Sequence, residues 1–258
     1  MPAQLVRWRV PPVLVLFHGF LGGPASWREV EALLPSAAVH KIALAGHGLP
    51  PARTPAASFE ALVEEVDRSL DALGEKVLLA GYSMGARLAL HLALRSPKRT
   101  LGALLIGVDP GLADPASRLA RRHWEDALAR TLREEGLERF VARWEALPLF
   151  ATQQRLPREV QEQQRRGRLG HDPFALADAL GLLGLGRMPS AWPQLDGLCR
   201  PRLRILAGER DSKFTEIGRR IAAAAPAASF AAVPEAGHNL ILEAPERVAR
   251  ELRAMLET

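Results

Sequence analysis

One stretch of nine residues, positions 77–85, constrains the fold of this chain more than any other. It reads Val-Leu-Leu-Ala-Gly-Tyr-Ser-Met-Gly, an apolar run that predicts a buried strand, followed by a Gly-x-Ser-x-Gly turn. The leucine- and alanine-rich residues 87–94 predict a helix directly after the turn. Side chains at Gly81 or Gly85 would collide where the strand passes into the helix. We therefore expect a sharp turn that exposes the hydroxyl of Ser83 above a sheet, as in nucleophilic serines.

Short apolar runs alternate with helical patterns on both sides of this stretch. Because strands that alternate with helices favour parallel pairing, the sequence predicts an α/β fold with a mostly parallel, doubly wound sheet. Ser26 and Ser58 are each expected to cap a helix, over residues 27–34 and 59–73 respectively. The predicted buried strands are residues 13–17, 39–44, 77–80, 103–108, 203–207 and 230–233.

The alternation of strands and helices stops between about residues 112 and 195. This interval is rich in Ala, Arg, Glu and Leu, contains no convincing strand pattern, and is far longer than a single crossover requires. We therefore predict a core formed by residues 1–110 and 197–258, and a helical cap, residues 111–196, inserted over the carboxyl edge of the sheet.

A catalytic triad is predicted from three positions that are far apart along the chain. A serine hydroxyl needs an imidazole to take its proton and a carboxylate to orient that imidazole. Asp211 stands at the end of one late predicted strand, and His238 follows the next. In a parallel sheet both positions reach the same edge as Ser83, so the sequence favours a Ser83–His238–Asp211 triad.

Two glycine-rich turns contain further histidines. The loop His18-Gly19-Phe20 predicts an oxyanion hole, in which the backbone N–H groups of Phe20 and Met84 stabilise developing negative charge. The alternative is an ordinary tight turn. His18 and His47 are expected to have structural roles in their turns.

Composition argues against several classes of protein. The net charge is +5, from 34 basic and 29 acidic residues, and no long basic run is present, so nucleic-acid binding is not expected. The single cysteine, Cys199, excludes an internal disulfide and indicates a reducing compartment. With neither a secretory signal nor an 18-residue apolar run, we expect a cytoplasmic protein without a membrane span, monomeric or weakly homo-oligomeric. Neither metal-ligand spacing nor a nucleotide-binding loop occurs, so no metal or cofactor is expected.

Arginines are the second functional signal. Arg87 follows Ser83 by one helical turn, and the predicted cap contains arginine groups at 118–122 and 165–168. Guanidinium groups bind carboxylates through paired hydrogen bonds, so they favour a small anionic substrate. A solvated helix face gives the same pattern in a chain so rich in arginine.

Five segments together resemble one family of the α/β-hydrolase fold, the 2-succinyl-6-hydroxy-2,4-cyclohexadiene-1-carboxylate synthases of menaquinone biosynthesis. The resemblance covers essentially the whole chain, and its most specific parts are the Glu-Arg-Asp-Ser-Lys-Phe run at 209–214 and the arginine one turn after Ser83. The segments are residues 18–22 (His-Gly-Phe-Leu-Gly), 46–48 (Gly-His-Gly), 81–87 (Gly-Tyr-Ser-Met-Gly-Ala-Arg), 208–214 (Gly-Glu-Arg-Asp-Ser-Lys-Phe) and 236–239 (Ala-Gly-His-Asn).

This resemblance implies a lyase of the α/β-hydrolase fold rather than a hydrolase. It implies that Ser83, activated by His238 and Asp211, abstracts a ring proton from 2-succinyl-5-enolpyruvyl-6-hydroxy-3-cyclohexene-1-carboxylate, after which pyruvate leaves. The residues that it implies in substrate contact are Tyr82, Arg87, Arg121, Trp144, Arg168 and Lys213. Two alternatives remain open: a serine hydrolase, either an esterase or a carbon–carbon bond hydrolase, acting on a small carboxylate-bearing substrate, and a non-catalytic ligand-binding module.

Overall fold

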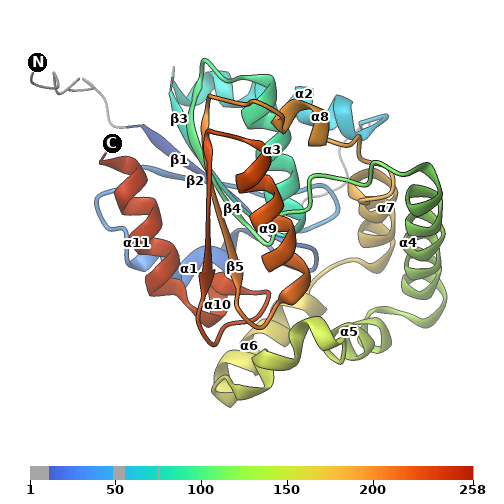
Figure 1. Ribbon diagram of the computed structural model, residues 1–258. Coiled ribbons are helices and arrows are strands. Elements are labelled where there is room, and N and C mark those ends of the chain that lie inside the picture. Colours follow the sequence, from blue (N-terminus) through green and yellow to red (C-terminus); the bar gives the residue numbers. More distant parts are fainter. Residues whose placement is uncertain (1–11, 49–55, 75, 258) are drawn as a thin grey trace, which may run out of the picture.

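The structure, a computed structural model, describes residues 12–48, 56–74 and 76–257 (Figure 1). Residues 1–11, 49–55, 75 and 258 of the predicted core lie outside this part. Within it, six strands form one sheet in the order β2-β1-β3-β4-β5-β6, and all neighbours pair in parallel. The predicted α/β class and parallel, doubly wound sheet are confirmed. The strands are β1 Val13–Phe17, β2 Val39–Ile42, β3 Val77–Tyr82, β4 Thr100–Ile106, β5 Arg202–Gly208 and β6 Ala228–Val233.

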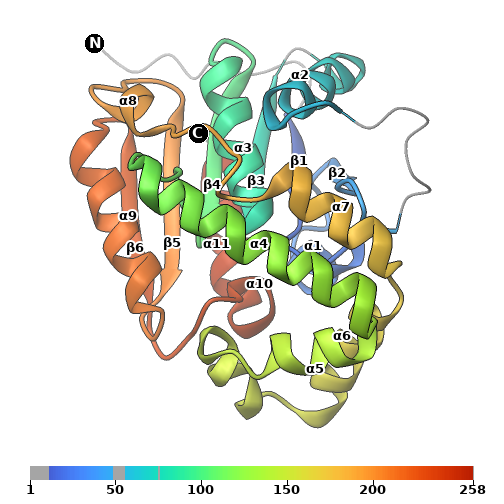
Figure 2. The ribbon, with the colours of Figure 1, turned by 90° about the vertical axis from the view of Figure 1, so that its right-hand side faces the viewer.

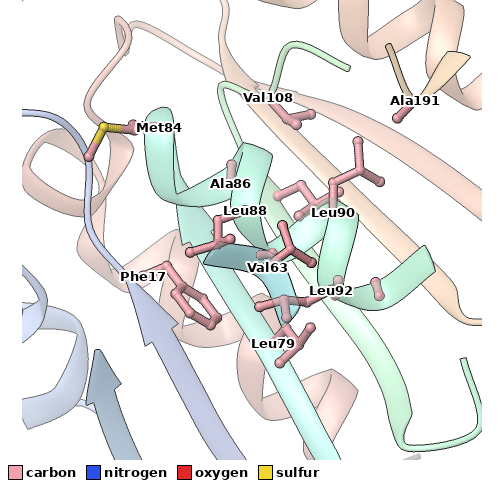
Figure 3. Close-up of a cluster of buried hydrophobic side chains, with 14 of the residues drawn as sticks. Phe17, Val63, Leu79, Met84, Ala86, Leu88, Leu90, Leu92, Val108 and Ala191 are labelled. Carbon is pink, nitrogen blue, oxygen red and sulfur yellow. The ribbon is translucent and has the colours of Figure 1, made fainter. Parts of the chain in front are cut away.

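Helices cover both faces of the sheet, so inner strands such as β1 and β3 read as apolar runs. The edge strands β2 and β6 are mostly half-buried, and the prediction that residues 39–44 and 230–233 form buried strands is wrong in this respect. Leu14 and Leu16 of β1 belong to an apolar cluster on the face covered by α1, α10 and α11, whereas Val15 and Phe17 belong to the cluster under α2, α3 and α9. Figure 3 shows part of the second cluster, in which Leu88 of α3 packs near Phe17. Each fully buried large apolar side chain stabilises the fold by about 2 kcal/mol. The helices are α1 Arg28–Ala32, α2 Phe59–Ser69, α3 Met84–Arg95, α9 Ser212–Ala224, α10 Leu240–Glu243 and α11 Pro245–Leu256.

The two predicted serine caps have different outcomes. Ser58 begins α2 as predicted, because its Oγ accepts a hydrogen bond from the N–H of Ala61 at 3.2 Å. Ser26 does not begin a helix. It is the third residue of a 3₁₀ turn, Pro24–Trp27, and its Oγ accepts from the N–H of Gly23 at 3.1 Å. Pro24 has a fixed φ and no N–H, so it starts the turn two residues before the serine.

The chain between β4 and β5 is helical. Residues 107–201, all of which the structure describes, contain no strand. We call residues 111–196 the helical insertion, and Figures 1 and 2 show its helices α4 to α7 gathered on one side of the molecule. They share an apolar cluster that includes Phe140, Leu176 and Leu21, the last from the loop after β1. The helices are α4 Pro115–Glu135, α5 Leu137–Glu145, η3 Pro148–Arg155, α6 Arg158–Leu169, α7 Pro173–Leu183 and α8 Trp192–Leu195.

Helix α4 is the longest element of the insertion, and local signals define both of its ends. The carboxylate of Asp114 accepts from the N–H of Ser117 at 2.7 Å, and Pro115 occupies the first helical position. The helix ends at Glu135 and is followed by the cap residue Gly136, whose φ is 81°. Its 21 residues carry many charges. No helix in the described part of the chain is both long and apolar enough to cross a membrane.

Candidate active site

Ser83 stands at the turn between β3 and α3. Its φ is 52°, a left-handed value that is uncommon for a residue with a side chain. A Cβ at Gly81 would collide with the carbonyl oxygen of Gly85, and one at Gly85 would collide with that of Phe17, so only glycine fits at both positions. The N–H of Ser83 donates to the carbonyl oxygen of Ile106 at 2.8 Å and fixes the turn to β4. The strand, turn and helix therefore present the serine at the carboxyl edge of the sheet.

Three side chains from separate elements form a hydrogen-bonded row at this edge. His238, in the loop after β6, has its Nε2 3.0 Å from Oγ of Ser83 and its Nδ1 2.6 Å from Oδ2 of Asp211. Asp211 is also the N-cap residue of α9, because its Oδ1 accepts from the N–H of Phe214 at 3.4 Å. Both His238 and Asp211 are buried. The structure thus brings the three predicted residues together in a geometry that can move a proton off the serine hydroxyl.

The imidazole of His238 is packed on several sides. The ring centroids of Phe214 and Tyr82 lie 4.5 Å and 5.4 Å from its own centroid. Gly107, with a φ of 58°, leaves just enough room: a Cβ there would lie 2.7 Å from Cε1 of His238. Tyr82 is buried, and this burial raises the pKa of its phenol far above the ordinary value.

A cavity of about 340 Å³ opens next to Ser83 and His238. Both the core and the helical insertion contribute to its walls. Most of the lining is aromatic or aliphatic, which suits a small organic ligand. Five charged side chains interrupt it, and they are Arg87, Asp109, Arg121, Glu125 and Lys213.

Arg87 is the basic residue nearest to Ser83 in sequence, one turn along α3. Its Nη1 is buried and has no hydrogen-bond partner among the described residues. Burial lowers the pKa of the guanidinium to about 10, opposed by the charges of Glu125 and Asp109 and reinforced by that of Arg121. Arg87 therefore stays charged at neutral pH. A half-buried cation whose buried Nη1 has no partner among the described residues is suited to a ligand carboxylate.

The other two basic side chains of the cavity are paired with acids. Arg121 donates through Nε to Oε1 of Glu125 at 2.8 Å, and its guanidinium lies 4.2 Å from the ring centroid of Trp124. Nζ of Lys213 lies 3.7 Å from Oδ2 of Asp109. Nε of Arg121 is committed to Glu125, and among the described residues its two Nη groups have no hydrogen-bond acceptor.

Glu125 and Asp109 are site residues that the sequence analysis missed. Glu125 is almost fully buried and also accepts from the N–H groups of Leu185 and Gly186, at 2.7 and 3.2 Å. Its four-residue spacing from Arg121 on one helix was a usable signal. Asp109 follows β4 as Asp211 follows β5, so its position at the same sheet edge was also readable.

The six residues implied in substrate contact divide into two groups. Arg87, Arg121, Trp144 and Lys213 line the cavity, where the ring centroid of Trp144 lies 5.2 Å from that of Phe20.

Tyr82 and Arg168 are not among the lining residues in the described part of the chain. Tyr82 contacts His238, whereas Arg168 donates to Oε1 of Glu145 at 2.9 Å and lies 5.7 Å from the ring centroid of Phe150. Tyr82 and Arg168 therefore lie behind His238 and Phe150, which do line the cavity.

The two predicted oxyanion-hole residues, Phe20 and Met84, both line the cavity beside Ser83. Met84 is the first residue of α3, so its N–H has no acceptor inside the helix and lies at the positive end of the helix dipole. A Cβ at Gly19 would lie 3.5 Å from Cβ of Ser83, which places the backbone before Phe20 against the serine.

The glycine-rich turns are held in place by their histidines. Nε2 of His18 accepts from the N–H of Leu44 at 3.0 Å, and Nε2 of His47 accepts from the N–H of Leu21 at 3.1 Å. Burial lowers the pKa of His18 to about 4 and that of His47 to about 3. Both rings are therefore neutral at pH 7, as an accepting nitrogen requires. Their expected structural roles are confirmed.

Similarity to known proteins agrees with this geometry. Residues 14–251 match the model of the "Alpha/beta hydrolase family". A putative 2-succinyl-6-hydroxy-2,4-cyclohexadiene-1-carboxylate synthase from Bacillus subtilis is 35% identical over 90% of this chain and 85% of its own length. The synthase from Serratia proteamaculans is 35% identical over 95% and 93%. MenH from S. aureus superimposes with a TM-score of 0.89 at 33% identity, over 95% of this chain and 93% of that chain. The chain therefore belongs to the alpha/beta hydrolase family and, within it, to the 2-succinyl-6-hydroxy-2,4-cyclohexadiene-1-carboxylate synthases.

Proposed function

We propose that this protein eliminates pyruvate from 2-succinyl-5-enolpyruvyl-6-hydroxy-3-cyclohexene-1-carboxylate and so forms 2-succinyl-6-hydroxy-2,4-cyclohexadiene-1-carboxylate, a step of menaquinone biosynthesis. The relatives named above carry this activity in their names. The observation in the structure that supports it best is the unpaired, buried Nη1 of Arg87, one helical turn from a serine that is hydrogen-bonded to His238. A ring carboxylate bound to that guanidinium would place ring C–H bonds close to Ser83.

The first chemical step is removal of the ring proton next to the succinyl ketone. Nε2 of His238 takes the hydroxyl proton of Ser83 while Oγ takes the proton from carbon, so the imidazole ends the step protonated. Asp211, hydrogen-bonded to Nδ1, holds the ring in the required orientation and stabilises its positive charge. The electron pair of the broken C–H bond moves onto the ketone oxygen.

The second step expels pyruvate. The N–H groups of Phe20 and Met84 stabilise the enolate oxygen while the negative charge is there. When the enolate collapses, a double bond forms between C2 and C3 and the ring double bond shifts from C3–C4 to C4–C5. The C–O bond between C5 and the enolpyruvyl group breaks in the same step. The departing enolate of pyruvate takes the proton back from His238, which restores the resting triad.

The charged and aromatic lining serves the same substrate. Arg87 and the Nη groups of Arg121 bind carboxylates, and Trp144 packs against the apolar part of the molecule. Residues 111–196 act as a cap that excludes water, which matters because the same serine could otherwise support hydrolysis. Tyr82 and Arg168 support His238 and Phe150 in this scheme.

The test is to supply the enolpyruvyl substrate and measure pyruvate with a coupled dehydrogenase. Ser83→Ala should abolish nearly all release, since the proton acceptor at carbon is gone. Arg87→Ala should lower kcat/KM by about 100-fold, because it removes a buried charged donor. Arg166→Ala, an exposed arginine of α6, is the matched control and should behave as wild type.

A serine hydrolase would use the same triad, so cleavage of a neutral ester is measured beside pyruvate release. If Arg87 binds substrate carboxylate, Arg87→Ala should leave that ester cleavage nearly unchanged. Equal loss of both activities in Arg87→Ala contradicts the carboxylate-binding role of Arg87. A wild-type enzyme that cleaves esters and releases no pyruvate contradicts the proposed function.

A further inference from the structure

The loop that contains His238 is held by one carboxylate that lies outside the triad. Glu243, the last residue of α10, accepts from the N–H of Gly237 through Oε2 at 2.7 Å. It also accepts from the N–H of Asn239 through Oε1 at 3.0 Å. Gly237 and Asn239 are the neighbours of His238 on either side. Two charge-assisted hydrogen bonds therefore fix the backbone immediately before and after the imidazole.

The rest of the loop leaves this backbone little freedom. A Cβ at Gly237 would overlap the side chain of Thr152, which belongs to η3 of the helical insertion. Asn239 is buried as well. The imidazole must meet Oγ of Ser83 on one side and Oδ2 of Asp211 on the other, so a small shift of the backbone would lengthen one of these hydrogen bonds.

We propose that Glu243 is a positioning residue for catalysis, which sets the backbone of His238 so that the ring reaches Ser83 and Asp211 together. Glu243 does not line the cavity in the described part of the chain, so it acts through His238 and not on the substrate. The part of its test that measures pyruvate release rests on the proposed function. The triad geometry itself does not depend on which reaction the serine performs.

A purely structural role is the competing explanation. Asn239 is the N-cap residue of α10, so a carboxylate that reaches back to its N–H resembles a capping side chain. A cap alone would change the stability of the fold and leave the chemistry of the folded enzyme as it is. The two roles are separated by a reaction rate measured per folded molecule.

The experiment compares Glu243→Gln and Glu243→Ala with the wild type and with Glu246→Gln, an exposed glutamate in the first turn of α11. Three quantities are measured: the rate constant for labelling of Ser83 by a neutral fluorophosphonate, kcat and KM for pyruvate release, and the thermal unfolding midpoint. The final extent of labelling gives the fraction of intact sites, to which both rates are normalised.

We expect Glu243→Gln to slow the labelling of Ser83 and to lower kcat, each by about tenfold, with KM changed less than about twofold. Glu243→Ala should lower both rates further, and Glu246→Gln should match the wild type. If Glu243→Ala does not fold, Glu243→Gln decides, because it keeps the size of the side chain and one acceptor oxygen.

Normalised labelling and kcat equal to wild type in Glu243→Gln, even with a lower unfolding midpoint, would overturn the proposal and leave Glu243 as a cap. A higher KM at unchanged kcat would overturn it too, because a positioning residue for His238 has no direct contact with substrate. A wild-type enzyme that is labelled at Ser83 but releases no pyruvate contradicts the proposed function alone, and the labelling rates then still test Glu243.

Discussion

At the scale of single residues, Gly107 limits where the imidazole of the triad can lie. Its φ is 58°, and a Cβ at this position would lie 2.7 Å from Cε1 of His238. We predict that Gly107→Ala moves the ring away from Ser83 and lowers kcat by about 100-fold. The measurement is kcat for pyruvate release together with the unfolding midpoint.

Gly181 provides the control for this substitution. It lies inside α7, and a Cβ there would meet nothing within 4 Å. Gly181→Ala should keep wild-type kcat and raise the free energy of unfolding by about 0.5–1 kcal/mol, since alanine favours a helix. A Gly107→Ala enzyme with wild-type kcat would show that the imidazole has more room than its packing indicates.

The residues that could be predicted from the sequence are those with a local signature. Ser83 stands in a Gly-x-Ser-x-Gly turn, and Asp211 and His238 each follow a strand, so their meeting at one sheet edge follows from topology. Glu125 has no such signature for its main contacts, because the N–H groups of Leu185 and Gly186 lie about sixty positions along the chain. Such a contact follows only from the packing of the insertion.

At the scale of elements, the two glycine-rich turns depend on neutral histidines. Burial lowers the pKa of His18 to about 4 and that of His47 to about 3, whereas an unfolded chain has a histidine pKa of about 6.5. Between these values the unfolded state binds more protons than the folded state, so stability falls as the pH falls below about 6.5. By pH 5 each of the two histidines has cost about 2 kcal/mol of stability.

This pH dependence should be reduced in a variant that lacks one of the rings. We predict that His47→Gln, whose amide oxygen can still accept from Leu21, loses about 2 kcal/mol less than wild type between pH 7 and pH 5. The measurement is the free energy of unfolding from denaturant titrations at the two pH values. Parallel behaviour of the two proteins would mean that His47 titrates alike in the folded and unfolded chain.

The elements could be predicted where the local pattern of apolar residues determines the structure. The prediction failed where a nearby residue, such as Pro24 before Ser26, changes the local backbone. All six predicted strands occur in the structure. The four inner strands are largely buried, whereas the edge strands β2 and β6 are mostly half-buried. Ser58 begins its helix because its Oγ accepts from the N–H of Ala61. Ser26 was wrongly predicted as a cap because Pro24 starts a 3₁₀ turn first.

At the scale of the whole molecule, charge should guide the substrate to its site. The net charge is +5, and three basic side chains face two acidic ones around the cavity. We predict that kcat/KM for the anionic substrate falls several-fold between about 10 mM and about 500 mM salt, because ions screen this attraction. Labelling of Ser83 by the neutral fluorophosphonate is the control and should not change. An equal salt response of the two reactions would point to an effect of salt on the fold instead.

The path of the chain through the sheet separates two tasks. β4 and β5 are hydrogen-bonded neighbours, and residues 107–201 form a single excursion between them, after Ser83 and before Asp211 and His238. Ser83, Asp211 and His238 are thus positioned by strands, and the distance between these strands does not depend on the length of the segment between β4 and β5. A different set of helices inserted between the same two strands would keep the triad and change the residues that contact the substrate. One fold can therefore acquire a new substrate while its catalytic groups stay unchanged.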